Sequence, residues 1–226
     1  MQKSITAVIE KYISEITSDE FHRYKSWDNC YKAFSTSNST DTKTLELAFY
    51  LASWGMYRGS SGLLQKNHLI HQGAVDIILS SQKLRCSKNR EISKANIEAV
   101  LELKSKLAKH YKSISFTKGS GESKPISPTD TLLSKIMLGT LGCVPAYDRY
   151  FIDGLKEMKM KHKSFNQDSL NQLYNFIEDN KTEIIDAQKL IKDKTKSHYP
   201  VMKILDMYFW QIGYDKEVAE KIRKGK

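Results

Sequence analysis

Apolar side chains recur with the spacing of an α-helix along most of this chain, and no other feature constrains its fold as strongly. The first stripe falls at positions i, i+3, i+4, i+7, i+8 and i+11, and consists of Ile5, Val8, Ile9, Tyr12, Ile13 and Ile16. Further stripes predict helices within residues 21–34, 63–79, 94–112, 129–138, 145–158, 170–177, 184–190 and 200–212. No segment alternates apolar and polar residues convincingly. The sequence therefore predicts an all-α, compact assembly of about eight to ten helices.

One predicted helix, over residues 44–57, is apolar almost all round. Its apolar residues are Leu45, Leu47, Ala48, Phe49, Tyr50, Leu51, Ala52, Trp54 and Met56. A helix without a polar face is expected to lie inside a protein. We therefore predict that this helix is buried at the centre of the fold.

The length of the chain predicts a single helical domain over residues 1–226. A chain of 226 residues is long enough for one large domain or for two small, closely packed ones. Residues 117–128 are rich in Gly, Pro and Ser, which predicts a loop. This loop is a candidate boundary between two helical halves, and a surface loop within one domain is the alternative.

Composition excludes several classes of protein. No apolar run approaches the roughly 18 residues that cross a bilayer, and residues 1–11 lack the apolar core of a signal peptide. Two histidines, His68 and His71, have no third metal ligand close by in the sequence. The cysteines are far apart and form no CxxC pair, which argues against a disulfide scaffold; they are Cys30, Cys86 and Cys143. We expect a reduced, soluble, cytoplasmic protein without a cofactor or a bound metal.

Positive charge is concentrated in one stretch of the sequence. Residues 61–125 hold twelve basic and five acidic residues, so +7 of the formal net charge of +10 falls there. Such a stretch attracts a polyanion, because each neutralised phosphate releases counterions. Lysine outnumbers arginine, which favours binding without sequence preference; a solvated lysine-rich surface is the alternative. The candidate nucleic-acid contacts are Lys83, Arg85, Lys88, Arg90, Lys104 and Arg149.

A glycine- and serine-rich turn after the apolar helix is a candidate phosphate-binding site. Its residues are Arg58, Gly59, Ser60, Ser61 and Gly62. The glycines let backbone N–H groups converge at the start of the next predicted helix, and an arginine there can form a bidentate contact with a phosphate. An ordinary turn between two helices, with the arginine in solvent, is the alternative.

Residues 134–151 carry the candidate catalytic groups. A helix, a glycine-containing turn and a proline-led helix follow one another, and Asp148 falls in the first turn of the second helix. The helix dipole favours an ionised carboxylate there. Such a carboxylate can stabilise an oxocarbenium-like centre or activate a water molecule. The alternative is a carboxylate that pairs with Arg149 or caps its own helix, with Lys135 as an exposed helix residue.

This stretch resembles the helix-hairpin-helix DNA glycosylase superfamily over about twenty residues. Val144, Pro145 and Asp148 resemble the Val-Pro-x-Asp segment that holds the essential aspartate of that family, with one additional residue before Asp148. Lys135 lies closer to the aspartate than the lysine of the lytic members, and the family's glycine-rich hairpin turn and four-cysteine cluster are absent. The resemblance implies that Asp148 and Lys135 are the catalytic groups and that the enzyme would be an N-glycosidic hydrolase.

Charge and resemblance together predict a nucleic-acid-binding helical protein on a divergent glycosylase-like scaffold. The expected partner is double-stranded DNA, bound without sequence preference, and no membrane contact is expected. The alternative is a non-enzymatic interaction protein of bacterial or phage defence type, whose basic surface docks an acidic protein partner.

Overall fold

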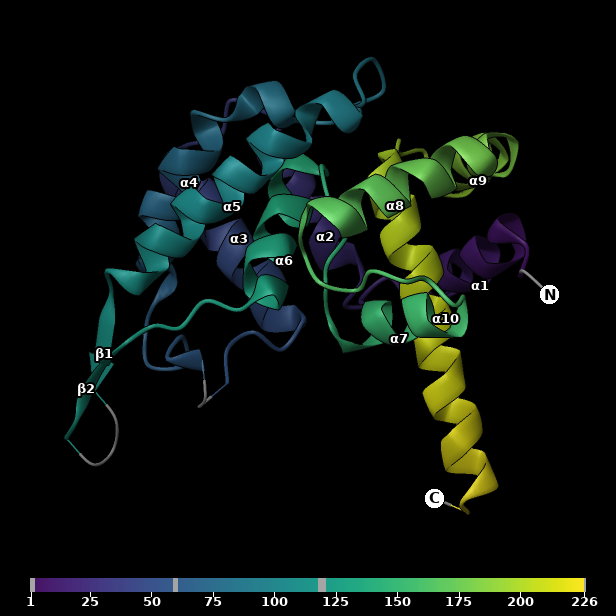
Figure 1. Ribbon diagram of the computed structural model, residues 1–226. Helices are drawn as coiled ribbons and strands as arrows, with labels where there is room; N and C mark the ends of the chain where they lie inside the picture. Colours follow the sequence, from purple (N-terminus) through teal and green to yellow (C-terminus); the bar gives the residue numbers. More distant parts are fainter. Residues whose placement is uncertain (1–2, 59–60, 118–120, 226) are drawn as a thin grey trace.

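Ten α-helices form most of the part of the chain that the structure describes. The computed structural model describes residues 3–58, 61–117 and 121–225, and these are all-α, as predicted, apart from one small hairpin (Figure 1). The helices are α1 (Ile5–Ser18), α2 (Lys25–Ala33), α3 (Thr40–Ser53), α4 (Gln72–Leu79), α5 (Ile97–Lys112), α6 (Asp130–Leu141), α7 (Arg149–Glu157), α8 (Gln167–Asp179), α9 (Lys181–Thr195) and α10 (Val201–Arg223). Between α3 and α5 lie the short 3-10 helices η2 (His68–His71), η3 (Gln82–Leu84) and η4 (Lys94–Asn96). None of the described helices is both long and apolar enough to cross a membrane.

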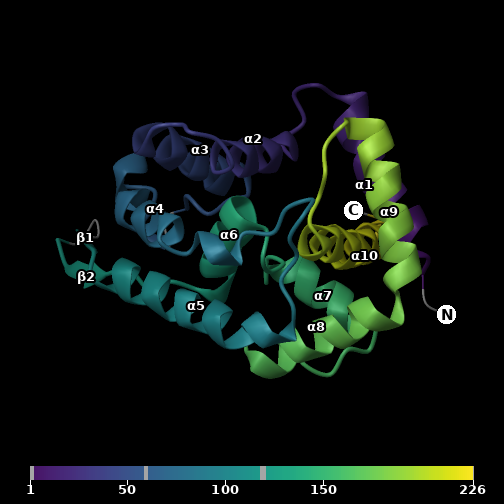
Figure 2. The same cartoon turned by 90° about the horizontal axis from the view of Figure 1, so that it is seen from above.

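The helices form two groups that share one core. Figure 2 shows α2–α6 on one side and α1 with α7–α10 on the other, and the chain crosses between the groups after α1 and again after α6. One helix of each group is innermost, since residues 132–141 of α6 and residues 202–213 of α10 are all buried. Apolar side chains of both groups belong to one continuous cluster.

The helix predicted at the centre lies partly at the surface. Leu45 and Phe49 of α3 are 54% and 56% exposed. The helix also ends at Ser53, and Trp54 caps it before Gly55, whose φ is +70°. The prediction of a fully buried helix over residues 44–57 is therefore wrong. Apolar residues occupy the outer face of α3 as well as its inner face, and α6 takes the central position instead.

The ends of α6 follow the predicted caps, and the start of α7 does not. The Thr129 hydroxyl accepts a hydrogen bond from the backbone at the start of α6, and Gly142, with a φ of +65°, ends the helix. The prediction that the next helix begins at Pro145 is wrong, because α7 begins after Asp148, which is its N-cap. The N–H groups of residues 146 and 147 donate to side chains of α10 and α6, which keeps this segment outside the helix.

The segment predicted as a loop, residues 117–128, contains a short strand. β1 (Ser115–Thr117) and β2 (Ser123–Pro125) pair antiparallel, with Phe116 opposite Lys124. Each strand has three residues, too few for an alternating pattern to be recognised in the sequence. The segment joins α5 to α6, which pack against each other within one group of helices. The crossings between the groups lie elsewhere, before α2 and before α7.

Helices α7 and α10 approach each other at two glycines. A Cβ atom at Gly154 would overlap the carbonyl oxygen of Phe209, and one at Gly213 would overlap the carbonyl oxygen of Tyr150. Glycine is the residue that permits such close backbone contact. The contact fixes the amino end of α7, and with it Asp148, against the buried half of α10.

A buried histidine joins three segments of the α2–α6 group. His71 is fully buried, its Nε2 lies 2.8 Å from the Tyr57 hydroxyl, and its Nδ1 lies 2.6 Å from the Tyr111 hydroxyl. Burial, with smaller contributions from His110 and His68, lowers the pKa of His71 to about 3. The imidazole is therefore neutral in the folded chain at pH values where the unfolded chain would protonate it.

We expect His71 to make the protein less stable as the pH falls below 6.5, the ordinary pKa of histidine. Between pH 6.5 and about 3 the unfolded chain binds a proton that the folded chain excludes, so the free energy of unfolding falls by about 1.4 kcal/mol per pH unit. Urea unfolding of the wild type and of His71→Phe, at about pH 7 and about pH 5, measures this contribution. The variant lacks both hydrogen bonds at either pH, so the comparison is between the two pH slopes. Equal slopes would contradict a neutral buried His71.

Candidate functional site

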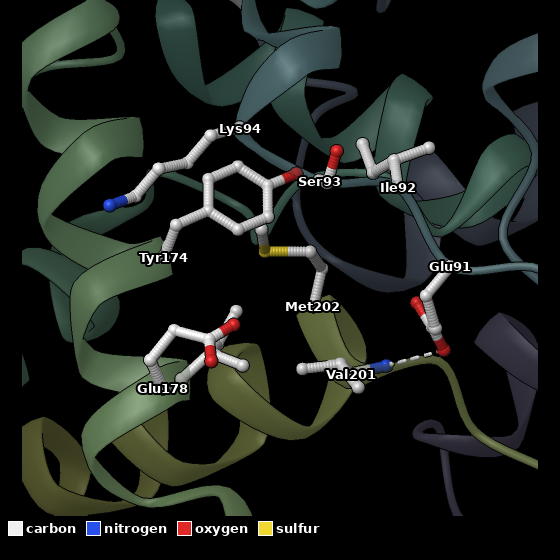
Figure 3. A pocket seen from close by; sticks show the side chains of 9 residues that line it. Glu91, Ile92, Ser93, Lys94, Tyr174, Glu178, Val201 and Met202 are labelled. Atoms are coloured by element: carbon white, nitrogen blue, oxygen red, sulfur yellow. Dashed lines mark hydrogen bonds between the residues drawn. The ribbon is translucent and has the colours of Figure 1, made fainter.

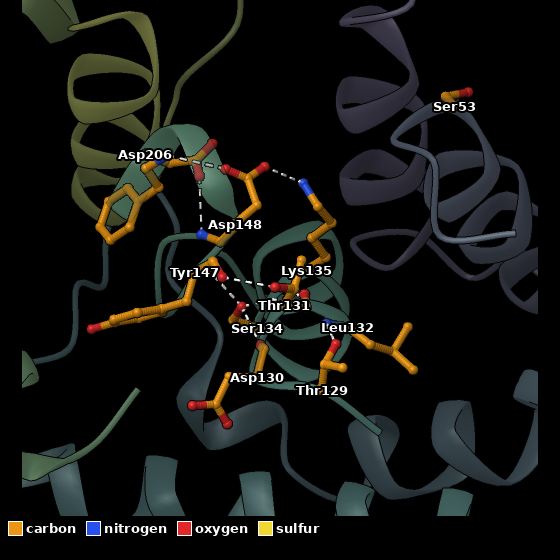
Figure 4. Close-up of polar contacts among 12 residues, drawn as sticks. Ser53, Thr129, Asp130, Thr131, Leu132, Ser134, Lys135, Tyr147, Asp148 and Asp206 are labelled. Carbon is orange, nitrogen blue, oxygen red and sulfur yellow. Dashed lines mark hydrogen bonds and ion pairs between the residues drawn. The ribbon is translucent and has the colours of Figure 1, made fainter. Parts of the chain in front are cut away.

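Lys135 of α6 and Asp148 form an ion pair where the two groups of helices meet. Lys135 Nζ lies 2.8 Å from Asp148 Oδ2, and the other carboxylate oxygen accepts a hydrogen bond from Phe151 N at 3.1 Å (Figure 4). The Lys135 side chain is 3% exposed and the Asp148 side chain is 14% exposed. The two candidate catalytic residues are thus in direct contact, and solvent reaches part of the carboxylate.

Side chains of α6 and α10 hold the segment that leads to Asp148. Tyr147 N donates to Ser134 Oγ of α6 at 2.8 Å (Figure 4). Ala146 N donates to Asp206 Oδ1 of α10 at 2.9 Å. Because two helices fix this segment, the Asp148 carboxylate is held in one position, as a reacting group requires.

A second buried ion pair lies beside the first. Lys203 Nζ and Asp206 Oδ2 of α10 are 2.9 Å apart, and both side chains are buried. The two lysines lie near the same indole ring, since Lys135 Nζ is 4.7 Å and Lys203 Nζ is 5.9 Å from the centroid of Trp54. We did not predict the second pair from the sequence. A lysine and an aspartate three residues apart within the apolar segment 201–210 were the available signal, because such charges are buried only when they are paired.

Five aromatic side chains form a surface that reaches the Lys135–Asp148 pair through Trp54, and we call it the aromatic wall. It consists of Tyr24, Trp54, Tyr150, Trp210 and Tyr214. The rings of Tyr24, Trp54 and Tyr150 meet Trp210 edge to face at 5.6, 5.8 and 5.1 Å, and Tyr214 stacks on it at 5.1 Å. Trp54, Tyr150 and Tyr214 are half-buried, so part of the wall is open to solvent. Tyr24 also stacks on Trp54 at 5.3 Å, so a planar ligand could stack only on ring surface that these contacts leave open.

Two exposed arginines lie against the aromatic wall. Arg23 Cζ is 4.9 Å from the centroid of Trp54, and Arg149 Cζ is 4.5 Å from the centroid of Tyr150. The Arg149 guanidinium also pairs with Glu217 at 2.6 Å. Asp148 and its neighbour Arg149 thus bind different partners, and the carboxylate pairs with Lys135.

The other predicted nucleic-acid contacts differ in whether their charged groups are already bound within the protein. Arg85 is buried, lies against the Tyr31 ring and donates to the carbonyl oxygens of Tyr31 and Thr140. Arg90 donates to the carbonyl oxygens of Arg85 and Gln82. These hydrogen bonds hold the Arg85 guanidinium inside the protein, whereas Arg90 is bound to two carbonyl oxygens at the exposed surface.

Three lysines complete this set of predicted contacts. Lys104 pairs with Asp130 at 2.7 Å and also donates to the carbonyl oxygen of Phe165. Lys83 and Lys88 are exposed and form no ion pair with any residue that the structure describes. Lys83 and Lys88 are therefore the members of the set whose ammonium groups are available to an external anion.

The lysine-rich stretch and Asp148 contact different parts of α6. Cys86 N donates to Leu141 O at 2.9 Å and Arg85 donates to Thr140 O, at the carboxyl end of the helix. Asp148 lies beside Lys135 instead. Since an α-helix rises 1.5 Å per residue, Thr140 is about 7.5 Å farther along its axis. Lys135 pairs with Asp148, and Lys135, Lys203 and Arg23 lie over the Trp54 ring.

The candidate phosphate-binding turn lies near the amino end of α6. Gly59 and Ser60 are outside the described residues. The Ser61 hydroxyl donates to Arg58 O at 2.7 Å, and Gly62 has a φ of +72°. Arg58 and Ser61 line a cavity of about 100 Å³ together with Thr129, the N-cap of α6. Lys135 lies two helical turns away from Thr129, so this turn and the ion pair are separate sites on one helix.

Thiol and metal chemistry have little support in this structure. The cysteines are free and buried, and burial raises the pKa of the Cys143 thiol to about 12. Among the described residues, no group of three His, Cys, Asp or Glu side chains could hold a metal ion.

No protein-family model, no curated protein and no solved structure matches this chain. The resemblance of residues 144–148 to helix-hairpin-helix glycosylases stays a prediction.

Proposed function

We propose that this chain binds nucleic acid without sequence preference and cleaves an N-glycosidic bond at the Lys135–Asp148 pair. The observation that carries the proposal is the 2.8 Å contact between Lys135 Nζ and Asp148 Oδ2, at the amino end of α7 and beside the half-buried Trp54. This contact joins the carboxylate and the lysine that the resemblance to the glycosylases singles out.

The pair supplies the two charges that this cleavage needs. When the bond between C1′ and the base nitrogen breaks, its electrons leave with the base and positive charge builds up on the sugar. The Asp148 carboxylate stabilises that charge, and the Lys135 ammonium donates a proton to the departing base. Water then adds to C1′, and its proton passes to the Lys135 amine. The products are the free base and an abasic sugar.

The aromatic wall supports a planar substrate at this position. A base that is cleaved must leave the duplex stack, and proteins bind such a base by stacking it on aromatic rings. The half-buried Trp54 lies 4.7 Å from Lys135 Nζ, and the part of its ring that Tyr24 and Arg23 leave open supports stacking of a base beside the pair.

Unpaired lysines from distant parts of the sequence support binding to a polyanion. Lys88 precedes η4 and Lys192 lies on α9, and both are exposed and free of ion pairs within the described chain. Burial, together with repulsion by Lys88 and Lys192, lowers the pKa of His198. Both lysines therefore lie within electrostatic range of His198, which supports a basic surface to which two lysine-rich segments contribute.

We expect the affinity for labelled duplex DNA to fall steeply with salt. If about four phosphates are contacted, a fourfold rise in salt lowers the affinity about a hundredfold. Fluorescence anisotropy at several salt concentrations measures the slope. Replacing Lys88 and Lys192 with glutamine should reduce the slope by about 2. Lys189→Gln is the matched control, because Lys189 already pairs with Asp186. The absence of binding even at low salt would exclude the proposal.

We expect Asp148→Asn to reduce the release of free base at least about a hundredfold while DNA binding is retained. Asparagine caps a helix as well as aspartate does, so α7 keeps its N-cap. The single variant leaves the buried Lys135 without an anionic partner, so Lys135→Gln combined with Asp148→Asn is a second, uncharged variant. Thermal unfolding checks that both are folded. The assay uses duplexes with damaged or mismatched bases, followed by cleavage at abasic sites. Unchanged base release in both variants would remove Asp148 from the mechanism.

A second candidate function, a non-enzymatic interaction protein, is favoured by the exposed apolar face of α3. Leu45 and Phe49 lie one helical turn apart and are 54% and 56% exposed, as is common at protein interfaces. Both carboxylate oxygens of Asp148 are also engaged within the protein. Under this function, wild-type protein releases no base, and an acidic protein binds with an affinity that Leu45→Ser and Phe49→Ser reduce.

A further inference from the structure

A cavity of about 470 Å³ opens between α8, the segment before η4 and the amino end of α10 (Figure 3). None of the residues that line it belongs to the site described above. Its volume is in the range of cavities that bind small organic molecules, about 300–1,000 Å³. The cavity therefore offers room for a ligand that the nucleic-acid proposal does not involve.

The floor of this cavity is apolar and contains an aromatic ring. Tyr174 of α8 and Met202 of α10 are buried, and Ile92 and Ile177 are half-buried beside them. A tyrosine face attracts a cation, and a methionine sulfur packs well against an aromatic ring. The floor thus suits a ligand with an aromatic body.

Two carboxylates without cationic partners stand on different sides of the cavity. Figure 3 shows Glu91 and Glu178 on opposite sides of Val201. Glu91 Oε1 accepts a hydrogen bond from Val201 N at 3.1 Å, and neither carboxylate forms an ion pair within the described residues. The lysine at the rim, Lys94, donates to Asn175 Oδ1 of α8 instead. Lys94 also lines the cavity, so the two carboxylates leave it with one negative charge in excess when both are ionised. Burial raises the pKa of Glu91 to about 7, and a bound cation favours its ionised form.

We propose that this cavity binds a small organic cation with an aromatic body. The ammonium group binds at Glu178, with Glu91 adding negative charge from the other side of the cavity, and the aromatic ring lies against Tyr174 and Met202. Charge complementarity carries the choice of ligand, because two carboxylates without ion-pair partners face a space that is otherwise mostly apolar, with Lys94 turned to Asn175. A cation there gains charge-assisted hydrogen bonds, whereas an anion of the same shape is repelled. The inference does not depend on nucleic-acid binding.

Three molecules with the same indole body and different charges test this proposal. Isothermal titration calorimetry of the full chain with tryptamine, tryptophol and indole-3-propionate compares a cation, a neutral molecule and an anion. We expect a Kd below about 1 mM for tryptamine, at least tenfold weaker binding of tryptophol and no measurable binding of indole-3-propionate. Equal affinities for tryptamine and tryptophol, or no binding of tryptamine, would overturn the proposal.

A pair of neighbouring acidic residues provides the matched variants. Glu178→Gln should weaken tryptamine at least fivefold and leave tryptophol unchanged. Asp179→Asn removes the same charge from the adjacent residue of α8, which does not line the cavity, and should change either affinity less than twofold. Both residues are exposed, so both variants should fold, and circular dichroism checks this. Equal effects of the two variants on tryptamine binding would mean that the ligand responds to the overall charge of the protein and not to Glu178 in the cavity, which would contradict the proposal. If the protein forms dimers at high concentration and tryptamine does not dissociate them, a second copy of the chain covers the cavity, which would contradict the proposal.

Discussion

Replacing Gly154 with alanine is expected to destabilise the protein by about 3 kcal/mol or more. The added Cβ atom would overlap the carbonyl oxygen of Phe209, a backbone atom of α10 that no side-chain rotation can move. Overpacking commonly costs about 1–3 kcal/mol, and here two helices must separate. The better helix propensity of alanine returns only about 1 kcal/mol. Urea unfolding followed by circular dichroism measures the loss.

The same contact can be tested from the other helix. Gly213→Ala would overlap the carbonyl oxygen of Tyr150 and should cost a similar free energy. Because one separation of α7 from α10 relieves both overlaps, the double variant with Gly154→Ala should cost less than the sum of the single variants. Lys156→Ala, on the exposed face of α7, is the control and should change stability by no more than about 0.5 kcal/mol. A Gly154→Ala protein as stable as the wild type would contradict the close packing of α7 on α10.

Helical periodicity predicted which face of a helix is buried better than it predicted which helix is central. In α1, the stripe from Ile5 to Ile16 is buried at every position except Val8, as expected from its spacing. The aromatic stripe of the second predicted helix was less reliable, since Phe21 is 86% exposed and α2 begins only at Lys25. The spacing of apolar residues reports on one helix at a time. The order of helices from the inside outward depends on contacts between distant segments, which this pattern does not contain.

The candidate site shows the same division between local and long-range information. Lys135 and Asp148 lie thirteen residues apart in one helix–turn–helix segment, and they were singled out by the place of Asp148 at a helix start and by a resemblance confined to that segment. Trp54 and Trp210, which meet in the aromatic wall, are separated by most of the chain, and neither lies in a local pattern that indicates a site. Asp148 was predicted in the first turn of a helix but is the N-cap of α7. Side chains of α6 and α10 bind the preceding segment, so α7 begins later than predicted. The count of charged residues likewise located the positive charge in residues 61–125, but it could not reveal that Arg85 is buried.

Lys203→Met is expected to destabilise the protein by about 3–5 kcal/mol. The ammonium is 2.9 Å from Asp206 Oδ2, and both side chains are buried. Methionine fills a similar volume, so the main consequence is an Asp206 carboxylate that stays buried without its cation. Asp206 also accepts the hydrogen bond from Ala146 N, so it cannot leave its position without releasing the segment before Asp148. Urea unfolding measures the loss.

Combining Lys203→Met with Asp206→Asn should recover most of that loss, because the double variant buries no charge. The asparagine Oδ1 can still accept the hydrogen bond from Ala146 N, so only the ion pair itself is removed. The matched control is Lys189→Met on α9, where an exposed lysine pairs with Asp186 three residues away; it should cost about 1 kcal/mol or less. A double variant no more stable than Lys203→Met would mean that the lysine acts through its contacts with the Tyr12 and Trp27 rings, 5.5 and 5.2 Å from Nζ. Recovery would instead show that the buried charge of Asp206 makes Lys203 necessary.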